Sequence, residues 1–457
     1  MLGAALDVLG TTMVAAIITT AVVLFGVATA TVVFTLDTWR NPEAPSRAAF
    51  PVPVPPRHGF SVLVPARHED QVLGDTLGKL LKQTHPRFEI LPIVSADDPK
   101  TAAIAEQYAE RHPDQIRVVW DTSPPDAKNK PKALNAAAAH CRLDVVTIVD
   151  AESDVAPDLF RHVDTVFQQR DVEVVQGGVQ LMDFHKSWWS TLNCLEYWLW
   201  FVSRLHFQAR NRFIPLGGNT VFVRREWLDR CGWYDPDCLA EDCDIGVRLS
   251  VAGARTAVAY TPALATLEET PGDLRSWFRQ RVRWNQGFLQ VLLKGDWRRL
   301  SHRRERALAL FTLGTPIVQT VTGMAVVLAL STALFVRTSD LVVLFSFLPL
   351  VPGMLLLGIQ QVALRDFYQA FRAHFTETYA EQISAGVPAR RRARLSWRHF
   401  AAVALSPLLY QPLLAAAGVV AVVRQFRGNL SWAKTDHIGA HRGAMERDTL
   451  VAAEIAG

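Results

Sequence analysis

The segment Asp144-Val145-Val146-Thr147-Ile148-Val149-Asp150-Ala151-Glu152-Ser153-Asp154 decides the fold class of this chain. Its uncharged run from Val145 to Val149 is typical of a strand buried on both faces of a parallel sheet. Three carboxylates follow within five residues, and ligands of open α/β sheets bind beyond the carboxyl ends of the strands. Clustered like charges repel, so a divalent cation among them is one prediction. A helix N-terminus capped by Ser or Asp is the alternative.

Composition excludes several classes of protein. With 457 residues, of which 49% are hydrophobic and 20% charged, the chain is too long for one ordinary domain and too apolar for a purely soluble protein. The formal net charge is +4 and no compact Lys/Arg run is interleaved with aromatic residues, so we expect no nucleic-acid partner. The five cysteines show neither a paired framework nor zinc spacing, so we expect reduced thiols and a cytoplasmic soluble part.

The N-terminal segment Leu9–Leu36 has no charged residue and exceeds the about 20 residues that cross a bilayer. It lacks a basic leader and an evident cleavage site, so it predicts a membrane helix rather than a removable signal peptide. Asp7 precedes this segment, and Arg40 and Arg47 follow it, so the positive-inside rule places the next domain in the cytoplasm. The prolines of segment 51–56 predict a stiff linker.

From residue 60 onward, short apolar runs alternate with helical patterns. The predicted strands are 60–66, 88–94, 116–120 and 144–149, and the predicted helices between them are 72–82, 102–111 and 132–140. Such alternation indicates βαβ units and a mostly parallel sheet covered by helices on both faces. Polar residues end the first two strands, at 67–69 and 97–98. The basic loop Lys128–Lys132 opens a helix, where lysines are favourable if an anion binds; a solvated loop is the alternative.

Three later segments each allow two interpretations. Trp188–Phe207 is rich in aromatics and poor in charge, which predicts a helix on the membrane surface or a buried amphipathic helix. Gly217-Gly218-Asn219 is either a turn that lets backbone approach a ligand or an ordinary tight turn. Segment 239–249 predicts a helix with Asp242 at its start, where the helix dipole alone favours a carboxylate.

Segment 273–300 predicts a long amphipathic helix. One face collects, at steps of three and four residues, Trp277, Gln280, Arg283, Trp284 and Gly287. Arginine can bind a diphosphate bidentately, and tryptophan can stack on a sugar ring. A basic helix that contacts anionic lipid is the alternative, and both interpretations are compatible.

The last third predicts membrane segments. Segments 307–336 and 341–364 are long and apolar, and the arginine-rich segment 390–394 follows them. Segment 401–423 is apolar but contains Pro407 and Pro412. A third full crossing would place later basic residues outside, against the positive-inside rule. This segment therefore is re-entrant, lies at the interface, or violates the rule.

Together these motifs resemble the family 2 glycosyltransferases, in particular the membrane-embedded branch of cellulose, chitin and hyaluronan synthases and several lipid glycosyltransferases. The resemblance covers about Phe60 to Gly287. It is carried by Val64-Pro65-Ala66-Arg67-His68-Glu69, Asp97-Asp98, Lys132-Ala133-Leu134-Asn135, Asp150-Ala151-Glu152, Glu241-Asp242 and Gln280-Arg281-Val282-Arg283-Trp284. The last is similar to the Q-x-x-R-W signature. The tail element Trp432-Ala433-Lys434-Thr435 also resembles one that lies on the cytoplasmic side in relatives.

The resemblance implies an α/β fold of GT-A type, a mostly parallel sheet with helices on both faces, together with amphipathic interface helices and transmembrane helices. It divides the chain into an N-terminal membrane helix and linker (1–50), a cytoplasmic catalytic domain (51–270), an interface helix (271–305) and a C-terminal membrane region with its tail (306–457). It implies an integral protein of the inner membrane.

The resemblance also implies the site and its partners. Asp150 and Glu152 would hold Mg²⁺ or Mn²⁺ on the diphosphate of a UDP- or GDP-linked sugar, and Asp242 would take the proton of the acceptor hydroxyl. The donor would contact Ala66, Glu69, Asp98, Lys132 and Asp150. Gln280 and Arg283 would cover the diphosphate and Trp284 would bear the acceptor sugar. Inversion would then give a β-linked product.

Two departures leave an alternative open. Glu152 stands where the family usually has Asp, with Asp154 as a competing ligand, and His68 stands where relatives usually have Asn. A non-catalytic membrane scaffold on a degenerate transferase domain is therefore a second hypothesis. A transporter is disfavoured because the membrane segments hold almost no ionisable residues. The acceptor is a glycan or a lipid, and the few membrane segments favour a lipid, or a pore completed by an oligomer or a partner.

Overall fold

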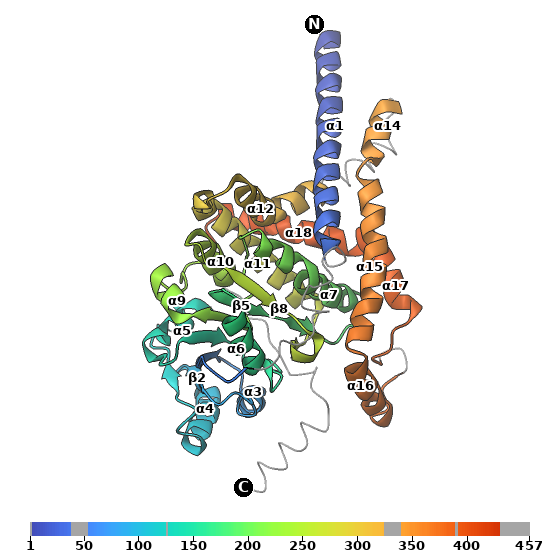
Figure 1. Ribbon diagram of the computed structural model, residues 1–457. Helices are drawn as coiled ribbons and strands as arrows, with labels where there is room; N and C mark the ends of the chain where they lie inside the picture. The colour runs from blue at the N-terminus through green and yellow to red at the C-terminus, as the bar shows by residue number, and fades with distance from the viewer. Residues whose placement is uncertain (1, 38–53, 125–126, 324–339, 389–391, 430–457) are drawn as a thin grey trace.

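The computed structural model describes residues 2–37, 54–124, 127–323, 340–388 and 392–429 (Figure 1). An α/β body holds the central sheet, and the long helices α1 (Leu2–Thr35) and α15 (Leu350–Ala370) pack beside each other on one side of it. Most of the expected linker, the end of the apolar segment 307–336 and the expected tail element Trp432–Thr435 lie outside the described residues.

The centre of the fold is a seven-stranded sheet in the order β3-β2-β1-β4-β7-β5-β8. Its strands are β1 (Phe60–Pro65), β2 (Phe88–Val94), β3 (Val119–Trp120), β4 (Val145–Ile148), β5 (Val174–Gly177), β7 (Val221–Arg224) and β8 (Thr256–Ala259). All neighbours are parallel except for β7, which is antiparallel to β4 and β5. The predicted mostly parallel α/β sheet is confirmed. A separate parallel pair joins β6 (Val179–Leu181) to β9 (Thr266–Glu268).

Helices cover both faces of the sheet, which explains the uncharged run of β4. Val146 and Ile148 belong to one hydrophobic core, and Val145 belongs to the other. One face is covered by α3 (Leu73–Leu80), α4 (Pro99–Arg111) and α6 (Leu159–Gln169). The opposite face is covered by α5 (Lys130–Ala136), α7 (Trp188–Leu199), α9 (Arg225–Cys231) and α10 (Glu241–Val251).

The topology brings distant loops to one edge of the sheet. β1 and β4 are parallel neighbours in which Leu63 pairs with Ile148, so the loops after both strands leave at the same edge. β7 runs the opposite way, so the turn Gly217–Thr220 that precedes it lies at this edge as well. Carboxyl ends of parallel strands are where α/β folds bind ligands, and the candidate site lies here.

A further layer of helices packs against this body and contacts α1 and α15. It contains α7, a π-helix (Trp200–Arg204), α8 (Leu205–Arg210), α11 (Leu274–Lys294), α12 (Arg303–Leu313), α17 (Trp397–Ala404) and α18 (Ser406–Phe426). The remaining long elements are α14 (Asp340–Phe347) and α16 (Arg372–Ser384). Short 3₁₀ turns lie at Ala138–His140, Pro262–Leu264 and Asp296–Arg299.

Among the described residues, two helical segments are long and apolar enough to cross a membrane, Val14–Thr35 and Ser406–Phe426. The first belongs to the expected N-terminal membrane helix. The second is the main part of the expected segment 401–423, which is divided at Leu405 into α17 and α18. In Figure 1, α18 runs across below the lower end of α1, at about the mid-height of α15, instead of alongside these helices, and it packs against α11.

Candidate active site

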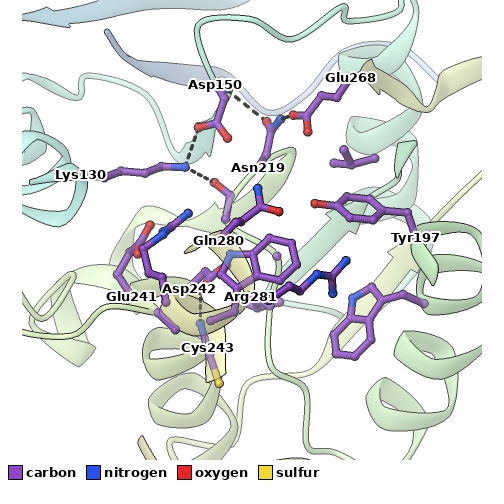
Figure 2. Close-up of a pocket in the computed structure, with 18 of the residues that line it drawn as sticks. Lys130, Asp150, Tyr197, Asn219, Glu241, Asp242, Cys243, Glu268, Gln280 and Arg281 are labelled. Carbon is purple, nitrogen blue, oxygen red and sulfur yellow. Dashed lines mark hydrogen bonds and ion pairs between the residues drawn. The ribbon is translucent and has the colours of Figure 1, made fainter. Parts of the chain in front are cut away.

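A cavity of about 720 Å³ opens at the carboxyl edge of the sheet and extends to the helical layer (Figure 2). The expected site residues on its wall are Ala66, Glu69, Asp150, Glu152, Asp242, Gln280, Arg283 and Trp284. These side chains come from the loops after β1 and β4, from the start of α10 and from one face of α11. The fold therefore brings an acid cluster, a second carboxyl pair and a tryptophan-bearing helix to one cavity.

Asp98 is an expected site residue that lies outside the cavity wall. It caps the N-terminus of α4, and its carboxylate accepts from the backbone N–H of Thr101 at 3.4 Å and of His68 at 2.5 Å. Burial opposes ionisation, but these hydrogen bonds lower the pKa of Asp98 below its ordinary value. His68 has a positive φ of 57°, so Asp98 holds the strained loop that carries Glu69 into the cavity.

Lys132 is the other expected residue outside the wall, and Lys130 lies in the cavity instead. The ammonium of Lys132 donates to the carbonyl of Ala127 at 2.7 Å. That of Lys130 lies 2.5 Å from Asp150 Oδ1 and 2.9 Å from the carbonyl of Gly218 (Figure 2). Asn129 caps the helix. Because each residue of an α-helix turns by about 100°, Lys130 and Lys132 are separated by about 200° around α5. The sequence identified the basic loop but not which lysine faces the site.

Lys130 sits among three carboxyl groups. Burial alone would lower its pKa, but Asp150, Glu241 and Asp242 raise it, so the ammonium is held in the charged form. Burial and the neighbouring Asp242 raise the pKa of Glu241 to about 7. Burial also raises the pKa of Asp242, whose Oδ1 accepts from the backbone N–H of Cys243 at 2.7 Å. Lys130 and Arg283 counteract both shifts. A carboxylate with a raised pKa accepts a proton more readily than one in water, as a general base requires.

Lys130→Gln should shift the pH dependence of activity. Loss of this cation raises the pKa of Glu241 and Asp242 further, because Lys130 lowers both. A base must be deprotonated, so activity falls as the pH drops through its pKa. The acidic limb of kcat/KM should therefore move to higher pH. Profiles of the wild type and of Lys100→Gln, an exposed lysine on α4, give the reference. An unmoved limb would show that Lys130 does not influence the base.

A hydrogen-bond network fixes the turn after β4. Asn219 Nδ2 donates to Ser153 Oγ at 2.7 Å and also to the carboxylate of Glu268. Asn219 Oδ1 accepts from the backbone N–H of Asp150 at 3.3 Å (Figure 2). The sequence marked the Gly-Gly-Asn turn, but nothing in it indicated Glu268, which ends β9. Asn219 thus couples the turn before β7 to the backbone of Asp150.

The donor set suits a hard divalent cation. Within the ranges that the structure describes, no three His, Cys, Asp or Glu side chains are grouped to hold a metal. Asp150 and Glu152 both line the cavity, whereas the competing Asp154 pairs with Lys79 Nζ at 2.8 Å and lies outside the wall. Mg²⁺ is commonly held by one or two carboxylates together with substrate phosphates and water. The two carboxylates therefore fit a metal that completes its shell with a diphosphate.

Close packing places α11 against the start of α10. A Cβ on Gly287 would lie 2.7 Å from the backbone nitrogen of Ala240, so a larger residue would push the helices apart. Ala240 immediately precedes Glu241 and Asp242 at the N-terminus of α10. The glycine therefore lets the face of Gln280, Arg283 and Trp284 approach the acidic pair.

Arg281 contacts the indole ring of Trp284 in the cavity wall. Its guanidinium lies 2.6 Å from Glu196 Oε2, contacts Asn193 Oδ1, and lies over the rings of Trp284 at 4.7 Å and Trp277 at 5.4 Å. Tyr410 of α18 donates to the same Glu196 oxygen at 2.8 Å. These contacts join α7, α11 and α18 at one wall of the cavity, which Arg281 and Glu196 also line, so Arg281 is a positioning residue for Trp284.

Arg281→Met should impair the use of acceptor more than that of donor. The substitution keeps side-chain length but removes the ion pair and both ring contacts, so Trp284 loses its fixed orientation. We expect the acceptor KM to rise by about tenfold, a loss of the size expected for charged hydrogen bonds, with the donor KM unchanged. Arg281→Lys should recover part of the loss because it keeps the charge. Equal changes in both KM values would indicate a general structural defect.

Comparison with known proteins agrees with this arrangement. Residues 55–287 match the family model described as "Glycosyltransferase like family 2". The probable glycosyltransferase YdaM of Bacillus subtilis is 26% identical over 243 residues, covering 50% of this chain and 54% of that protein. The beta-monoglucosyldiacylglycerol synthase of Trichormus variabilis is 26% identical over 229 residues, covering 49% and 48%. The chain thus spans about half the length of these curated relatives.

Two further similarities concern a polysaccharide synthase and a solved structure. The poly-beta-1,6-N-acetyl-D-glucosamine synthase of Staphylococcus epidermidis is 23% identical over 266 residues, covering 57% of this chain and 61% of that protein. The mannosyltransferase PcManGT from Pyrobaculum calidifontis, in complex with GDP-Man and Mn²⁺, has a TM-score of 0.51 at 19% identity. That match covers 90% of this chain and 99% of the other. At this identity the likeness concerns the fold, and the expected GT-A-like fold is confirmed.

Proposed function

Because this chain belongs to the family 2 glycosyltransferases, we propose that it is a metal-dependent, inverting enzyme that moves a sugar from a nucleotide-sugar donor to a glycan or lipid acceptor. The observation that carries the proposal is the shared cavity of Asp150, Asp242 and Trp284. These residues supply a place for the diphosphate, a proton acceptor and a surface for a sugar. The nucleotide sugar and Mn²⁺ named with the mannosyltransferase, and the lipid and polysaccharide products named for the relatives, are consistent with it.

In the proposed reaction, the donor diphosphate lies between the loop after β4 and the face of α11. Asp150 and Glu152 would hold a divalent cation, which would neutralise negative charge on the departing diphosphate. Arg283 and Gln280 bind the diphosphate from the opposite wall, with the bidentate geometry that suits arginine. The ammonium of Lys130 forms an ion pair with Asp150, which balances the charge of this carboxylate and fixes its orientation. Ala66 and Glu69, in the loop after β1, border the nucleoside end of the cavity.

The acceptor hydroxyl is oriented by Trp284 and deprotonated by Asp242. Its oxygen forms a bond to the anomeric carbon while the bond from that carbon to the diphosphate breaks, and the diphosphate keeps the electron pair. The proton of the hydroxyl passes to Asp242, whose raised pKa suits this role. Attack opposite the leaving group inverts the anomeric centre, so an α-linked donor gives a β-linked product.

We further propose that the protein is integral to the inner membrane with its catalytic domain in the cytoplasm. The apolar segment Val14–Thr35 and the apolar helix α18 support membrane attachment. The transverse course of α18 in Figure 1 favours an interfacial position over a further crossing. Free cysteines, all five of them in the part of the chain that the structure describes, suit a reducing compartment.

A panel of radiolabelled nucleotide sugars tests this function directly. Detergent-solubilised protein should turn over UDP-glucose, UDP-N-acetylglucosamine or GDP-mannose when membranes supply the acceptor. Solvent-extractable label indicates a lipid product, and retained label of high mass indicates a polymer. The Asp242→Asn variant is the control for contaminating activities. Absence of turnover and of nucleotide-sugar binding would support the alternative of a non-catalytic membrane scaffold.

A further inference from the structure

The far end of the cavity, away from the acid cluster, is built from helices that also carry exposed apolar surface. Its wall there includes Thr31 and Thr35 of α1, Gln319, and Leu356 and Gln360 of α15. α1 and α15 pack side by side (Figure 1). Away from the cavity they expose large apolar side chains, including Val22, Val23, Val351, Met354 and Leu355. A membrane lipid can therefore contact the same two helices that line the cavity.

A π-helix shapes this end of the cavity. Trp200–Arg204 interrupts the α-helical course between α7 and α8, and such π-bulges are frequent at functional sites. Within it, Ser203 donates to the carbonyls of Phe34 at 2.6 Å and Thr35 at 3.0 Å. These are among the last carbonyls of α1, which lack partners inside the helix. The next residue, Arg204, lines the cavity. Two adjacent residues of the π-helix therefore have different roles: Ser203 binds the end of α1, and Arg204 lies in the cavity wall.

Arg204 has an incomplete set of partners. Its guanidinium carbon lies 5.5 Å from the ring centroid of Trp200, and within the described ranges it makes no hydrogen bond or ion pair. Burial lowers its pKa, and only the field of Glu196 opposes this effect. Glu196 is already bound by Arg281 at 2.6 Å and by Tyr410 at 2.8 Å. Glu196 thus supplies one negative charge beside two guanidinium groups, which leaves a net positive charge at this part of the cavity wall.

An anion would complete this arrangement. A guanidinium presents five N–H donors in a planar fork that matches phosphate, and stacking on Trp200 leaves its edge available for such contacts. A neutral sugar would satisfy some of the donors but would leave the charge uncompensated. Since the cavity reaches helices with exposed apolar surface, the phosphate of a lipid fits both the charge and the position.

We propose that Arg204 binds the phosphate of the lipid acceptor, and that this enzyme glycosylates a hydroxyl of a phosphate-bearing membrane lipid. This inference rests on the proposed function, because the acceptor hydroxyl must reach Asp242 in the same cavity. The phosphate is a binding group and does not react. The hydroxyl oxygen gains the bond to the anomeric carbon, Asp242 gains the proton, and the diphosphate leaves with its electron pair.

Binding without donor tests the inference separately from the reaction. Protein in dodecyl maltoside, which contains no phosphate, is titrated with brominated phosphatidylglycerol or brominated diacylglycerol, and quenching of tryptophan fluorescence gives each Kd. We expect the wild type to bind phosphatidylglycerol more tightly by about tenfold or more, as for hydrogen bonds between charged groups. Arg204→Gln should abolish this preference without changing diacylglycerol binding. Arg204→Lys, which keeps the charge but loses the fork, should retain part of it.

The matched control is Arg230→Gln. Arg230 lies over Trp227 at 4.4 Å on α9, is exposed, and lies outside the cavity wall. The Arg230→Gln variant should leave the preference for phosphatidylglycerol over diacylglycerol unchanged. Unaltered preference in Arg204→Gln would overturn the inference, as would equal affinity of the wild type for both lipids. Displacement of the lipid by millimolar inorganic phosphate alone would assign the subsite to a free anion. None of these readouts needs a nucleotide sugar, so a failed transfer assay and a failed binding assay are distinguishable.

A transfer assay completes the test. With a donor that the enzyme turns over, label should enter phosphatidylglycerol in the wild type, and the KM for this lipid should rise by about tenfold in Arg204→Gln. The donor KM should stay the same. Label that enters diacylglycerol as efficiently as phosphatidylglycerol would exclude a role of the phosphate in acceptor choice.

Discussion

Asp242→Asn protein is expected to bind its nucleotide-sugar donor normally and to transfer sugar about 10²–10⁴-fold more slowly, the contribution of a positioned base. Asparagine keeps the size of the side chain and can still accept from the backbone N–H of Cys243. It cannot take a proton from the acceptor hydroxyl at neutral pH. Initial rates of transfer, together with donor affinity from calorimetry, separate loss of chemistry from loss of binding.

The neighbouring carboxyl provides the decisive comparison. Glu241 lies beside Asp242 at the start of α10 and also lines the cavity, so Glu241→Gln alters the same charge in nearly the same place. We expect this variant to retain transfer within about tenfold of the wild type, well above the loss expected for the base. If Glu241→Gln is inactive and Asp242→Asn transfers at the normal rate, the roles of the two groups are reversed.

Removal of divalent metal is expected to abolish transfer, and added Mn²⁺ or Mg²⁺ should restore it. The reason is the donor's diphosphate, whose negative charge must be neutralised as it leaves. Affinity for the free nucleoside diphosphate should also rise with Mn²⁺ in the wild type. Asp150→Asn and Glu152→Gln should lose this gain, because both carboxylates line the cavity. Titration calorimetry with and without the metal measures the effect independently of turnover.

Asp154→Asn is the matched control for the metal site. Asp154 belongs to the same acidic segment but pairs with Lys79 and forms a backbone bridge with Leu267, outside the cavity wall. Its substitution should leave the metal-dependent gain in affinity intact. Metal-independent transfer by the wild type would contradict the assignment of Asp150 and Glu152.

The sequence predicted those parts of the molecule that depend on local pattern. The uncharged run before Asp150 required a doubly covered strand, and β4 is one. Three- and four-residue spacing placed Gln280, Arg283 and Trp284 on one helical face, and all three line the cavity. Asp242 was expected at a helix start, and it occupies the first turn of α10.

The remaining features depend on long-range contacts. An apolar run reads the same in either direction, so the antiparallel course of β7 could not be predicted from its residues. Glu268 enters the site because β9 pairs with β6, a contact between segments far apart in the chain. The selection of Lys130 over Lys132 depends on how α5 packs, because Asn129 and Asn135 donate to the carbonyls of Pro236 and Tyr234, far along the chain. Glu196 becomes a shared acceptor only when α7, α11 and α18 meet.

The hydrogen bond between Tyr410 and Glu196 has a practical consequence for dissecting this enzyme. The ring of Tyr410 also lies 4.9 Å from that of Trp277, which is fully buried in the intact chain. A recombinant fragment of residues 54–287 would keep the sheet and every carboxylate of the cavity, but it would lose Tyr410 from Glu196 and expose the ring of Trp277 to water. Such a truncated, water-soluble enzyme would be expected to bind the nucleotide sugar but to hydrolyse it instead of transferring the sugar to an acceptor.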